Sequence, residues 1–265
     1  MRNFLKLIHF VLSQQFGLDL IRFFRGVCNT PSFIIEAVKF KIKFSGKFCL
    51  KPCLHDKSDS GGDIRGEYFW QDLIVAQMVF ENSPERHLDI GSRIDGFVAH
   101  VASFRVIDVC DIRPLPQSIP NVNFRRMDLM EVARERPSHQ MRYDSVSCLH
   151  VIEHFGLGRY GDHLDVDGFR RGIAGLSNLL VDNGKLYLST PLGSERVEFN
   201  ANWVFDPQTI ISELNDNGLE VENLFLFDGS AKFTPVDLLE EACLQKIRSM
   251  KYNLGLFICS KALKC

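Results

Sequence analysis

The sequence lacks any apolar stretch long enough to cross a bilayer, and it lacks a recognisable secretory leader. Its first apolar run is interrupted by Lys6 and His9, and no cleavage site of the A-x-A kind follows it. A spanning helix needs about 20 consecutive apolar residues, and a leader needs an unbroken apolar region before its cleavage site. We therefore expect neither feature, and we expect a cytoplasmic protein.

Strong net charge, internal repeats and low-complexity tracts are also missing. The 31 basic and 33 acidic side chains leave a net charge of −2, which gives no bias toward nucleic acid. We expect no nucleic-acid partner. Without repeats, a chain of 265 residues can bury one substantial core, so one large domain with an N-terminal extension is the simplest organisation.

The sequence shows only weak patterns for disulfide bonds and for metal sites. The chain has eight cysteines, and Cys110, Cys148 and Cys259 lie inside apolar runs, as small buried side chains do in a reducing compartment. Three potential zinc ligands occur close together: Cys49, Cys53 and His55. No second cysteine pair stands at zinc spacing, so we favour a structural role for them. A calcium loop starting at His163 would need a glutamate where Ala174 stands. We expect no metal site.

Glycine is scarce in the stretch around which the chain is organised, residues 87–97 (HLDIGSRIDGF). An apolar run that ends on Asp89 and Gly91, followed by apolar positions at helical spacing, predicts a buried strand, a tight turn and a helix start. Gly91 lets the backbone turn close to a ligand, and the helix N-terminus offers free N–H groups. A dinucleotide loop needs small residues where Arg93 and Asp95 stand. We therefore disfavour a nicotinamide-dependent oxidoreductase and favour another adenosine cofactor.

Strands and helices alternate beyond this turn, which predicts a parallel sheet covered by helices on both faces. A helix with Ile74, Val75 and Met78 on its apolar face leads into the first strand. The later strands are predicted over residues 105–111, 122–129, within 143–155 (a stretch that ends on His150, Glu153 and His154), 185–193, 218–227 and 253–262. The last two are expected to pair as an antiparallel hairpin at the sheet edge, and further helices are expected around residues 173–179 and 207–217.

Acidic residues stand at the ends of the first three predicted strands: Asp89, Asp111 and Asp128. Parallel sheets bind ligands outside the carboxyl ends of their strands, and an acidic residue about twenty positions after the glycine turn can accept both ribose hydroxyls of an adenosine. One such aspartate is often only a helix cap or turn residue. Three of them beside a glycine turn indicate a binding site.

The succession DIGSR, VCDIR, RRMDL, YDSVSCLHVIEH and NGKLYLSTP resembles the class I S-adenosylmethionine-dependent methyltransferase superfamily over roughly residues 66–262. More narrowly, HLDIGSRIDGFVAHVASF, SCLHVIEHFGLGRYGDHLD and VEFNANWVFD resemble an uncharacterised methyltransferase-like family of unknown function. Its bacterial members often accompany surface-polysaccharide assembly. The resemblance implies a Rossmann-like α/β fold with a mostly parallel seven-stranded sheet, an antiparallel edge hairpin and an N-terminal helical extension.

The resemblance also implies S-adenosylmethionine as cofactor, held by eight residues: Asp89, Gly91, Ser92, Arg93, Asp111, Asp128, Leu129 and His150. It places Asp89 and Gly91 near the methionine part, Asp111 on the ribose, Asp128 with Leu129 beside adenine, and His150 near the sulfonium. The superfamily prefers small residues at positions 93 and 95. Arg93 could pair with the cofactor carboxylate, or form a structural ion pair with Asp95 or Asp111.

Methyl transfer to a hydroxyl requires alignment of the acceptor and removal of its proton. Four residues after the fourth strand are candidates for this catalytic work: His154, Glu153, Tyr160 and Asp162. We expect His154 to act as the base and Glu153 to orient it, although a Glu-His pair here could simply cap the next helix. The expected function is O-methylation of a sugar in a surface polysaccharide or its precursor, with a small-molecule or glycan acceptor as partner. The alternative is a non-catalytic scaffold with this fold in a glycan-assembly complex.

The N-terminal extension, residues 1–60, differs in character from the domain expected over residues 61–265. Its first 50 residues carry eight basic and two acidic side chains and are rich in Phe, Ile and Leu. Helical spacing over residues 3–27 breaks at Gly17, whereas residues 33–44 fit a helix or a strand. Such an arm can contact an anionic membrane at its inner face. Packing against its own domain is the simpler alternative.

Overall fold

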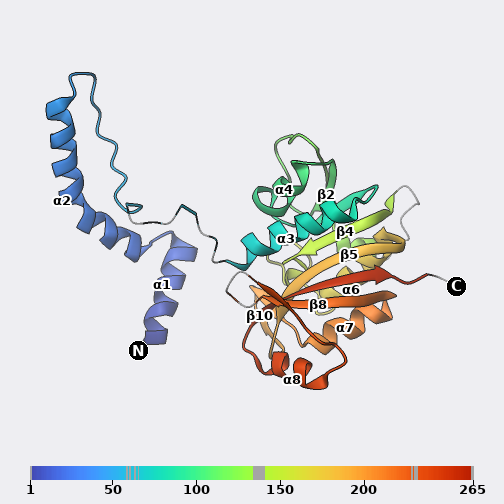
Figure 1. Cartoon of the computed structure of the whole chain (residues 1–265). Coiled ribbons are helices and arrows are strands. Elements are labelled where there is room, and N and C mark those ends of the chain that lie inside the picture. The colour runs from blue at the N-terminus through green and yellow to red at the C-terminus, as the bar shows by residue number, and fades with distance from the viewer. Residues whose placement is uncertain are drawn as a thin grey trace. The chain divides into compact units, whose positions relative to one another are not determined.

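The computed structural model describes residues 2–57, 59, 61–62, 64, 66–133, 141–227, 229 and 232–263. The chain divides into two units, Met1–Asp63 and Ile64–Cys265, which are drawn with the elements labelled in Figure 1. The boundary expected after residue 60 lies close to this division.

The first unit contains two helices, α1 (Arg2–Phe16) and α2 (Leu20–Lys43). They separate at Gly17, which has a φ of +69°, and Asp19 caps α2 by accepting a hydrogen bond from the backbone N–H of Arg22 at 3.0 Å. The break predicted at Gly17 is therefore confirmed, and residues 33–44, which fitted two states, are helical up to Lys43. None of the helices within the described residues combines the length and apolarity needed to cross a membrane.

Within the described part of the second unit, eight strands form one sheet in the order β3-β2-β1-β4-β5-β10-β8-β9. Neighbouring strands from β3 to β5 are parallel, and β10 is antiparallel to both β5 and β8. The strands have the following bounds: β1 (His87–Ile90), β2 (Ile107–Asp111), β3 (Val122–Arg126), β4 (Tyr143–Leu149), β5 (Leu180–Leu192), β8 (Leu219–Phe227), β9 (Phe233–Pro235) and β10 (Asn253–Lys261). The mostly parallel α/β sheet expected from the sequence is confirmed.

The structure adds three details to the predicted sheet. The sheet has eight strands instead of seven, because the three residues of β9 pair with β8 and are too few to show a periodicity. The predicted antiparallel pair is confirmed, since β10 pairs with β8; β9 and α8 (Glu241–Ser249) lie between these two strands in sequence, and β10 lies inside the sheet. The strand predicted from residue 185 begins earlier, at Leu180, because residues 181–184 form a bulge within β5, where the register with β4 shifts after Tyr143.

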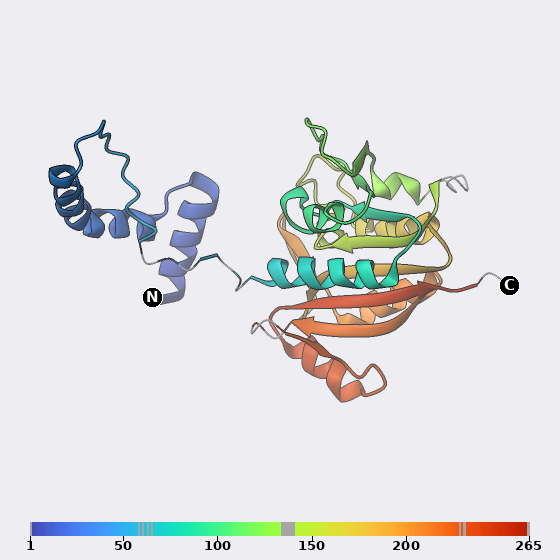
Figure 2. The same cartoon turned by 45° about the horizontal axis from the view of Figure 1, so that its top comes forward.

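Helices cover both faces of the sheet and divide the core in two (Figure 2). One face packs against α3 (Glu67–Asn82), the short π-helix η1 (Ile94–Val98) and α4 (Ala99–Ala102), through Val75, Phe97 and Val101 among others. The other packs against α6 (Gly168–Leu179), α7 (Pro207–Asp216) and α8, through Ile173, Leu176 and Leu214. Two short elements follow strand ends, α5 (Leu129–Val132) and the 3-10 turn η3 (Ile152–His154). A separate two-stranded sheet joins β6 (Arg196–Glu198) to β7 (Asn202–Val204).

The carboxyl ends of β1, β2, β3 and β4 lie at one edge of the sheet. The parallel register pairs Ile90 with Cys110 and Asp111 with Arg126, so the ends of β1, β2 and β3 are aligned. The fold therefore brings the residues that follow these strands to a common edge, as parallel sheets do.

Candidate functional site

The turn after β1 depends on glycine. Gly91 has a φ of +69°, a conformation in which other residues are strained, and its N–H donates to the carbonyl of Cys110 on β2 at 2.8 Å. A Cβ at this position would lie 2.7 Å from Cγ1 of Val151. The chain after β1 is thus held against β2 and against the chain after β4.

Asp89 is fully buried just before this turn. Its carboxylate accepts hydrogen bonds from the backbone N–H of Ser92 at 3.0 Å, from the Ser92 hydroxyl at 2.7 Å and from the Ser147 hydroxyl at 2.6 Å. Burial raises the pKa of Asp89 to about 7, although these donors favour the charged form. Asp89 and Ser92, both predicted to contact the cofactor, therefore brace the turn from inside.

Asp111 at the end of β2 is paired with Arg113, a residue that sequence reasoning missed. Nε of Arg113 lies 3.0 Å from Oδ1 and 3.1 Å from Oδ2, and Nη2 lies 2.5 Å from Oδ2. Nη2 also donates to the carbonyl of Gly91 at 3.3 Å. The Asp111 side chain is only 13 % exposed beneath this guanidinium. The sequence DIR, in which Arg113 follows Asp111 by two residues, was the signal from which this ion pair could have been predicted.

Asp128 and Arg93 have structural roles that the sequence analysis had left open as alternatives: one caps a helix and the other forms an ion pair. Asp128 caps α5 by accepting from the backbone N–H of Met130 at 2.9 Å, and Leu129 after it is buried. Arg93 pairs with Asp95 through two contacts of 3.0 and 2.7 Å. This pair is exposed on both sides, so its contribution to stability is small.

His150 lies after β4 in a buried charged cluster. Its φ is +56°, its Nδ1 lies 2.8 Å from Oε1 of Glu153, and its Nε2 lies 3.3 Å from Oε1 of Glu67. The ring of Tyr68 packs on the imidazole with centroids 4.5 Å apart. Glu67 in turn accepts a hydrogen bond of 2.5 Å from the hydroxyl of Tyr252. Glu67 and Tyr68 begin α3, and no pattern in the sequence could have placed them beside a residue more than eighty positions later.

The ion pairs in this cluster determine the pKa values of His150 and Glu67. Burial alone would lower the pKa of His150, but the hydrogen bonds and charges of Glu153 and Glu67 outweigh it and raise this pKa to about 9. Burial acts to raise the pKa of Glu67, yet His150 and Tyr252 hold it below its ordinary value. At neutral pH an imidazolium therefore lies between two carboxyl groups.

His154 is oriented by the backbone, and the predicted pairing with Glu153 was wrong. Nδ1 of His154 lies 2.7 Å from the carbonyl of Ala201, whereas its Nε2 is 3.9 Å from Oε1 of Glu153. The 3-10 turn directs Glu153 to His150 instead, at 2.8 Å. Because a carbonyl only accepts, Nδ1 of His154 carries the proton and Nε2 keeps a lone pair. Burial is the main cause that lowers the pKa of His154, so the ring is neutral at pH 7.

Asp162 organises the glycine-rich loop behind His154. Its Oδ2 accepts from the backbone N–H groups of Gly156 and Gly158 at 2.9 and 3.1 Å, and its Oδ1 accepts from that of Tyr160 at 3.2 Å. Both glycines have positive φ. The carboxylate of Asp162 thus holds its own loop in shape.

Tyr160 joins this loop to the end of β2. The guanidinium carbon of Arg113 lies 4.7 Å from the centre of the Tyr160 ring, and that of Arg159 lies 5.1 Å from it. The ring also meets His154 edge-on, with centroids 5.5 Å apart. The structure therefore brings together two predicted groups, the Asp111 end of β2 and the His154–Tyr160 pair, with Arg113 between them.

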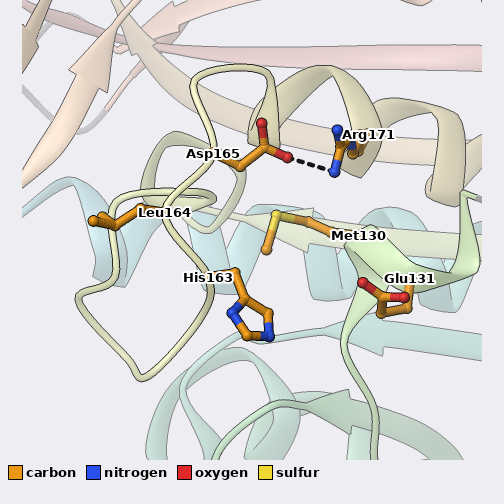
Figure 3. Close-up of a pocket in the computed structure, with 6 residues that line it drawn as sticks. All are labelled: Met130, Glu131, His163, Leu164, Asp165 and Arg171. Carbon is orange, nitrogen blue, oxygen red and sulfur yellow. Dashed lines mark ion pairs between the residues drawn. The ribbon is translucent and has the colours of Figure 1, made fainter.

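A hollow of about 460 Å³ opens beside α5 (Figure 3). In the view of Figure 3 the ion pair of Asp165 with Arg171, 2.7 Å long, lies above His163 and Glu131. The remaining lining residues are Met130 and Leu164. Met130 and Glu131 come directly after Leu129, so the hollow adjoins the predicted adenine-side residues in the chain.

Comparison with known proteins connects this geometry to a fold. A family model described as "Caenorhabditis protein of unknown function, DUF268" matches residues 116–230, and no curated protein matches the chain. The 1,6-didemethyltoxoflavin-N1-methyltransferase of Burkholderia thailandensis, solved with its substrate and S-adenosylhomocysteine, superposes with a TM-score of 0.50 at 12 % identity, over 89 % of this chain and 91 % of its own. A Galdieria sulphuraria protein, provisionally named a sarcosine dimethylglycine methyltransferase, gives 0.50 at 12 % identity, over 73 % and 85 %. The fold is thus the Rossmann-like methyltransferase fold.

Proposed function

We propose that the protein is an S-adenosylmethionine-dependent methyltransferase acting on a hydroxyl of a small-molecule acceptor. The observation that carries this is the alignment of Asp89, Asp111 and Asp128 at the ends of three adjacent parallel strands, beside the Gly91 turn. On a sheet of this order, that edge is where an adenosine-containing ligand is held. The bound cofactor would supply a methyl group already activated on a sulfonium.

The residues at this edge fit such a cofactor. Asp111 is the candidate for the ribose hydroxyls, because its carboxylate already accepts a pair of donors from Arg113. That guanidinium stands in for the two hydroxyls, so Arg113 must move aside or share Asp111 when the cofactor binds. We assign Asp128 and Leu129 to the adenine, with the neighbouring hollow of about 460 Å³ as room for its outer edge.

The cluster around His150 suits a positively charged group. One imidazolium and the carboxyl groups of Glu153 and Glu67 leave an excess of negative charge at the end of β4. Because the cluster is buried, solvent screens this negative charge only weakly. We infer that it favours the sulfonium over the neutral thioether that remains after transfer.

His154 is the candidate base. Its Nδ1 is tied to the Ala201 carbonyl at 2.7 Å, so its Nε2 can accept the proton of an acceptor hydroxyl while the methyl group arrives. Its lowered pKa keeps Nε2 available at neutral pH. Arg159 donates to the same carbonyl at 3.0 Å, which restrains the carbonyl that orients the imidazole.

We further propose a sugar hydroxyl of a surface polysaccharide or its cytoplasmic precursor as the acceptor. Support for this class comes from the sequence resemblance of the segment from Glu153 to Asp162. The polar loop that begins there could hydrogen-bond a hydroxyl-rich ligand.

A second candidate is a non-catalytic scaffold with the methyltransferase fold in a glycan-assembly complex. One observation favours it: Arg113 occupies the carboxylate that a cofactor ribose would need. A scaffold would keep this ion pair permanently, whereas an enzyme must open it.

Transfer of labelled methyl groups tests the proposed activity. Purified full-length protein would be incubated with methyl-labelled S-adenosylmethionine and an extract of cells that lack the protein. We expect label in a product released by glycosidases and none with His154→Ala. Absence of label in any fraction, despite cofactor binding, would favour the scaffold; label in protein or nucleic acid would contradict the sugar acceptor.

A further inference from the structure

We propose that α2 lies in the plane of an anionic membrane surface and docks there through its apolar face. This goes beyond the proposed reaction and does not depend on it. Eight apolar side chains of α2 fall within an arc of roughly 120° at the spacing of a helix. They are Leu20, Phe23, Phe24, Val27, Ile34, Ile35, Val38 and Ile42, and each is 44 % to 79 % exposed.

The first unit covers the opposite face of this helix. After α2 the chain turns back alongside it (Figure 1), where it forms hydrogen bonds and ion pairs with polar side chains and Phe48 stacks on Phe40. Asn29 donates to the carbonyl of Leu54 at 2.7 Å, Glu36 pairs with Lys57 at 2.5 Å, and Arg25 pairs with Asp59 at 3.2 Å. The returning segment therefore fixes the polar face of α2 and leaves the apolar face bare within its own unit.

The basic side chains beside the apolar face of α2 favour an anionic membrane surface as its binding partner. Lys39 and Lys41 lie on its two flanks, roughly 160° apart around the helix axis and on either side of the apolar arc. Long basic side chains in this position can bury their stems and reach outward to phosphate groups. The first 50 residues carry a formal charge excess of basic over acidic residues that matches an anionic surface. A neutral apolar groove of a protein would gain nothing from these lysines.

The geometry requires the helix to lie in the surface plane. With 24 residues, α2 is about 36 Å long, so its length alone would allow it to span a bilayer. Its basic side chains prevent that, and no helix in the described part of the chain qualifies as a span. A long helix with one apolar and one charged face is the type that settles at the headgroup boundary.

Sedimentation with vesicles tests this docking. Full-length protein would be mixed with vesicles of phosphatidylcholine alone or of phosphatidylcholine with phosphatidylserine, at low and high salt. We expect pelleting with the phosphatidylserine vesicles only, and weaker pelleting at high salt because the attraction is screened over a Debye length of about 8 Å at physiological ionic strength. Protein that stays in the supernatant, or pelleting indifferent to both phosphatidylserine and salt, would overturn the proposal.

Two matched substitutions locate the contact. Phe24→Glu changes the centre of the apolar face, and Phe40→Glu makes the same change roughly 160° around the helix, outside that face. We expect Phe24→Glu to weaken vesicle binding at least about tenfold and Phe40→Glu to leave it within about twofold. Lys39→Gln with Lys41→Gln should weaken binding about 25-fold, since each lysine near an anionic surface contributes about fivefold.

The helical circular dichroism signal of each variant serves as the folding control. Equal loss with Phe24→Glu and Phe40→Glu would contradict docking through this face. If wild-type protein does not bind vesicles and Phe24→Glu lowers the unfolding temperature or converts a dimer to a monomer, the apolar face packs on protein and the proposal fails.

Discussion

The guanidinium of Arg113 forms a bidentate ion pair with the carboxylate of Asp111, with its Nη2 2.5 Å from Oδ2 and its Nε 3.0 Å from Oδ1. The same guanidinium lies 4.7 Å from the centre of the Tyr160 ring and donates to the Gly91 carbonyl at 3.3 Å. Arg113 thus links the turn after β1, the end of β2 and the loop after β4, at the place where the ribose of a cofactor would bind.

Removing this guanidinium should strengthen cofactor binding. Arg113 is 45 % exposed, and a pair exposed to this degree contributes about 0.2 to 1 kcal/mol. Arg113→Ala should therefore tighten S-adenosylmethionine binding about 1.4- to 5-fold by calorimetry, because the ribose no longer competes for Asp111. Arg113→Lys keeps the charge and should remain close to wild type. Weaker binding by Arg113→Ala would mean that the arginine itself contacts the cofactor.

His154→Ala should lower turnover by about 10² to 10⁴ while the affinity for S-adenosylmethionine stays nearly unchanged, because the imidazole acts on the acceptor. Burial lowers the pKa of His154 from its ordinary value of 6.5, so wild-type turnover should be flat near pH 7 and fall only in more acidic solution. Steady-state kinetics across pH measure both effects, with His55→Ala in the first unit as the control. Full activity of His154→Ala would place the base elsewhere.

Asp162→Ala should destabilise the loop that it caps. Three backbone N–H groups lose their acceptor, and the free energy of unfolding should drop by about 1 to 3 kcal/mol. Asp167→Ala, which removes an exposed ion pair with Arg170 in the same segment, should change it by less than about 0.5 kcal/mol. Denaturant titrations compare the two variants. Equal and negligible effects would show that the Asp162 hydrogen bonds do not hold the loop.

The buried cluster around His150 predicts a pH dependence of stability. The folded-state pKa of His150 is raised from 6.5 to about 9, so its stabilisation is fully present below pH 6.5 and is lost as the pH rises through 9. The stability difference between wild type and His150→Asn should shrink by about 3 kcal/mol across this window. Asparagine tolerates the positive φ at this position. A constant difference across this window would mean that His150 is not charged in the folded protein.

Local patterns in the sequence were enough to predict most strands and the strand-end aspartates. An apolar run ending on Asp89 and Gly91 needs only its neighbours to form a strand and a turn, and the break at Gly17 follows from a glycine flanked by helical periodicity. The order of the sheet then brings Asp89 and Asp111 to one edge without further information.

Contacts between residues far apart in the sequence could not be predicted from local sequence patterns. Glu67 meets His150 only because the start of α3 packs beside the end of β4. The choice of Glu153 between His150 and His154 depends on a single 3-10 turn, in which adjacent residues face different ways. Asp162 looked catalytic because it is a carboxylate near a histidine, whereas its oxygens face the N–H groups of its own loop.

Binding of S-adenosylmethionine at the ends of β1, β2 and β3 is the central claim, and calorimetric titration of the full-length protein tests it most directly. We expect micromolar binding by wild type and a loss of about 2 to 3 kcal/mol with Asp111→Ala, which removes two charge-assisted hydrogen bonds to the ribose. Asp182→Ala, an exposed aspartate in the β5 bulge near the start of β4, should bind like wild type. No binding up to millimolar cofactor, or equal binding by the Asp111→Ala and Asp182→Ala variants, would contradict the claim.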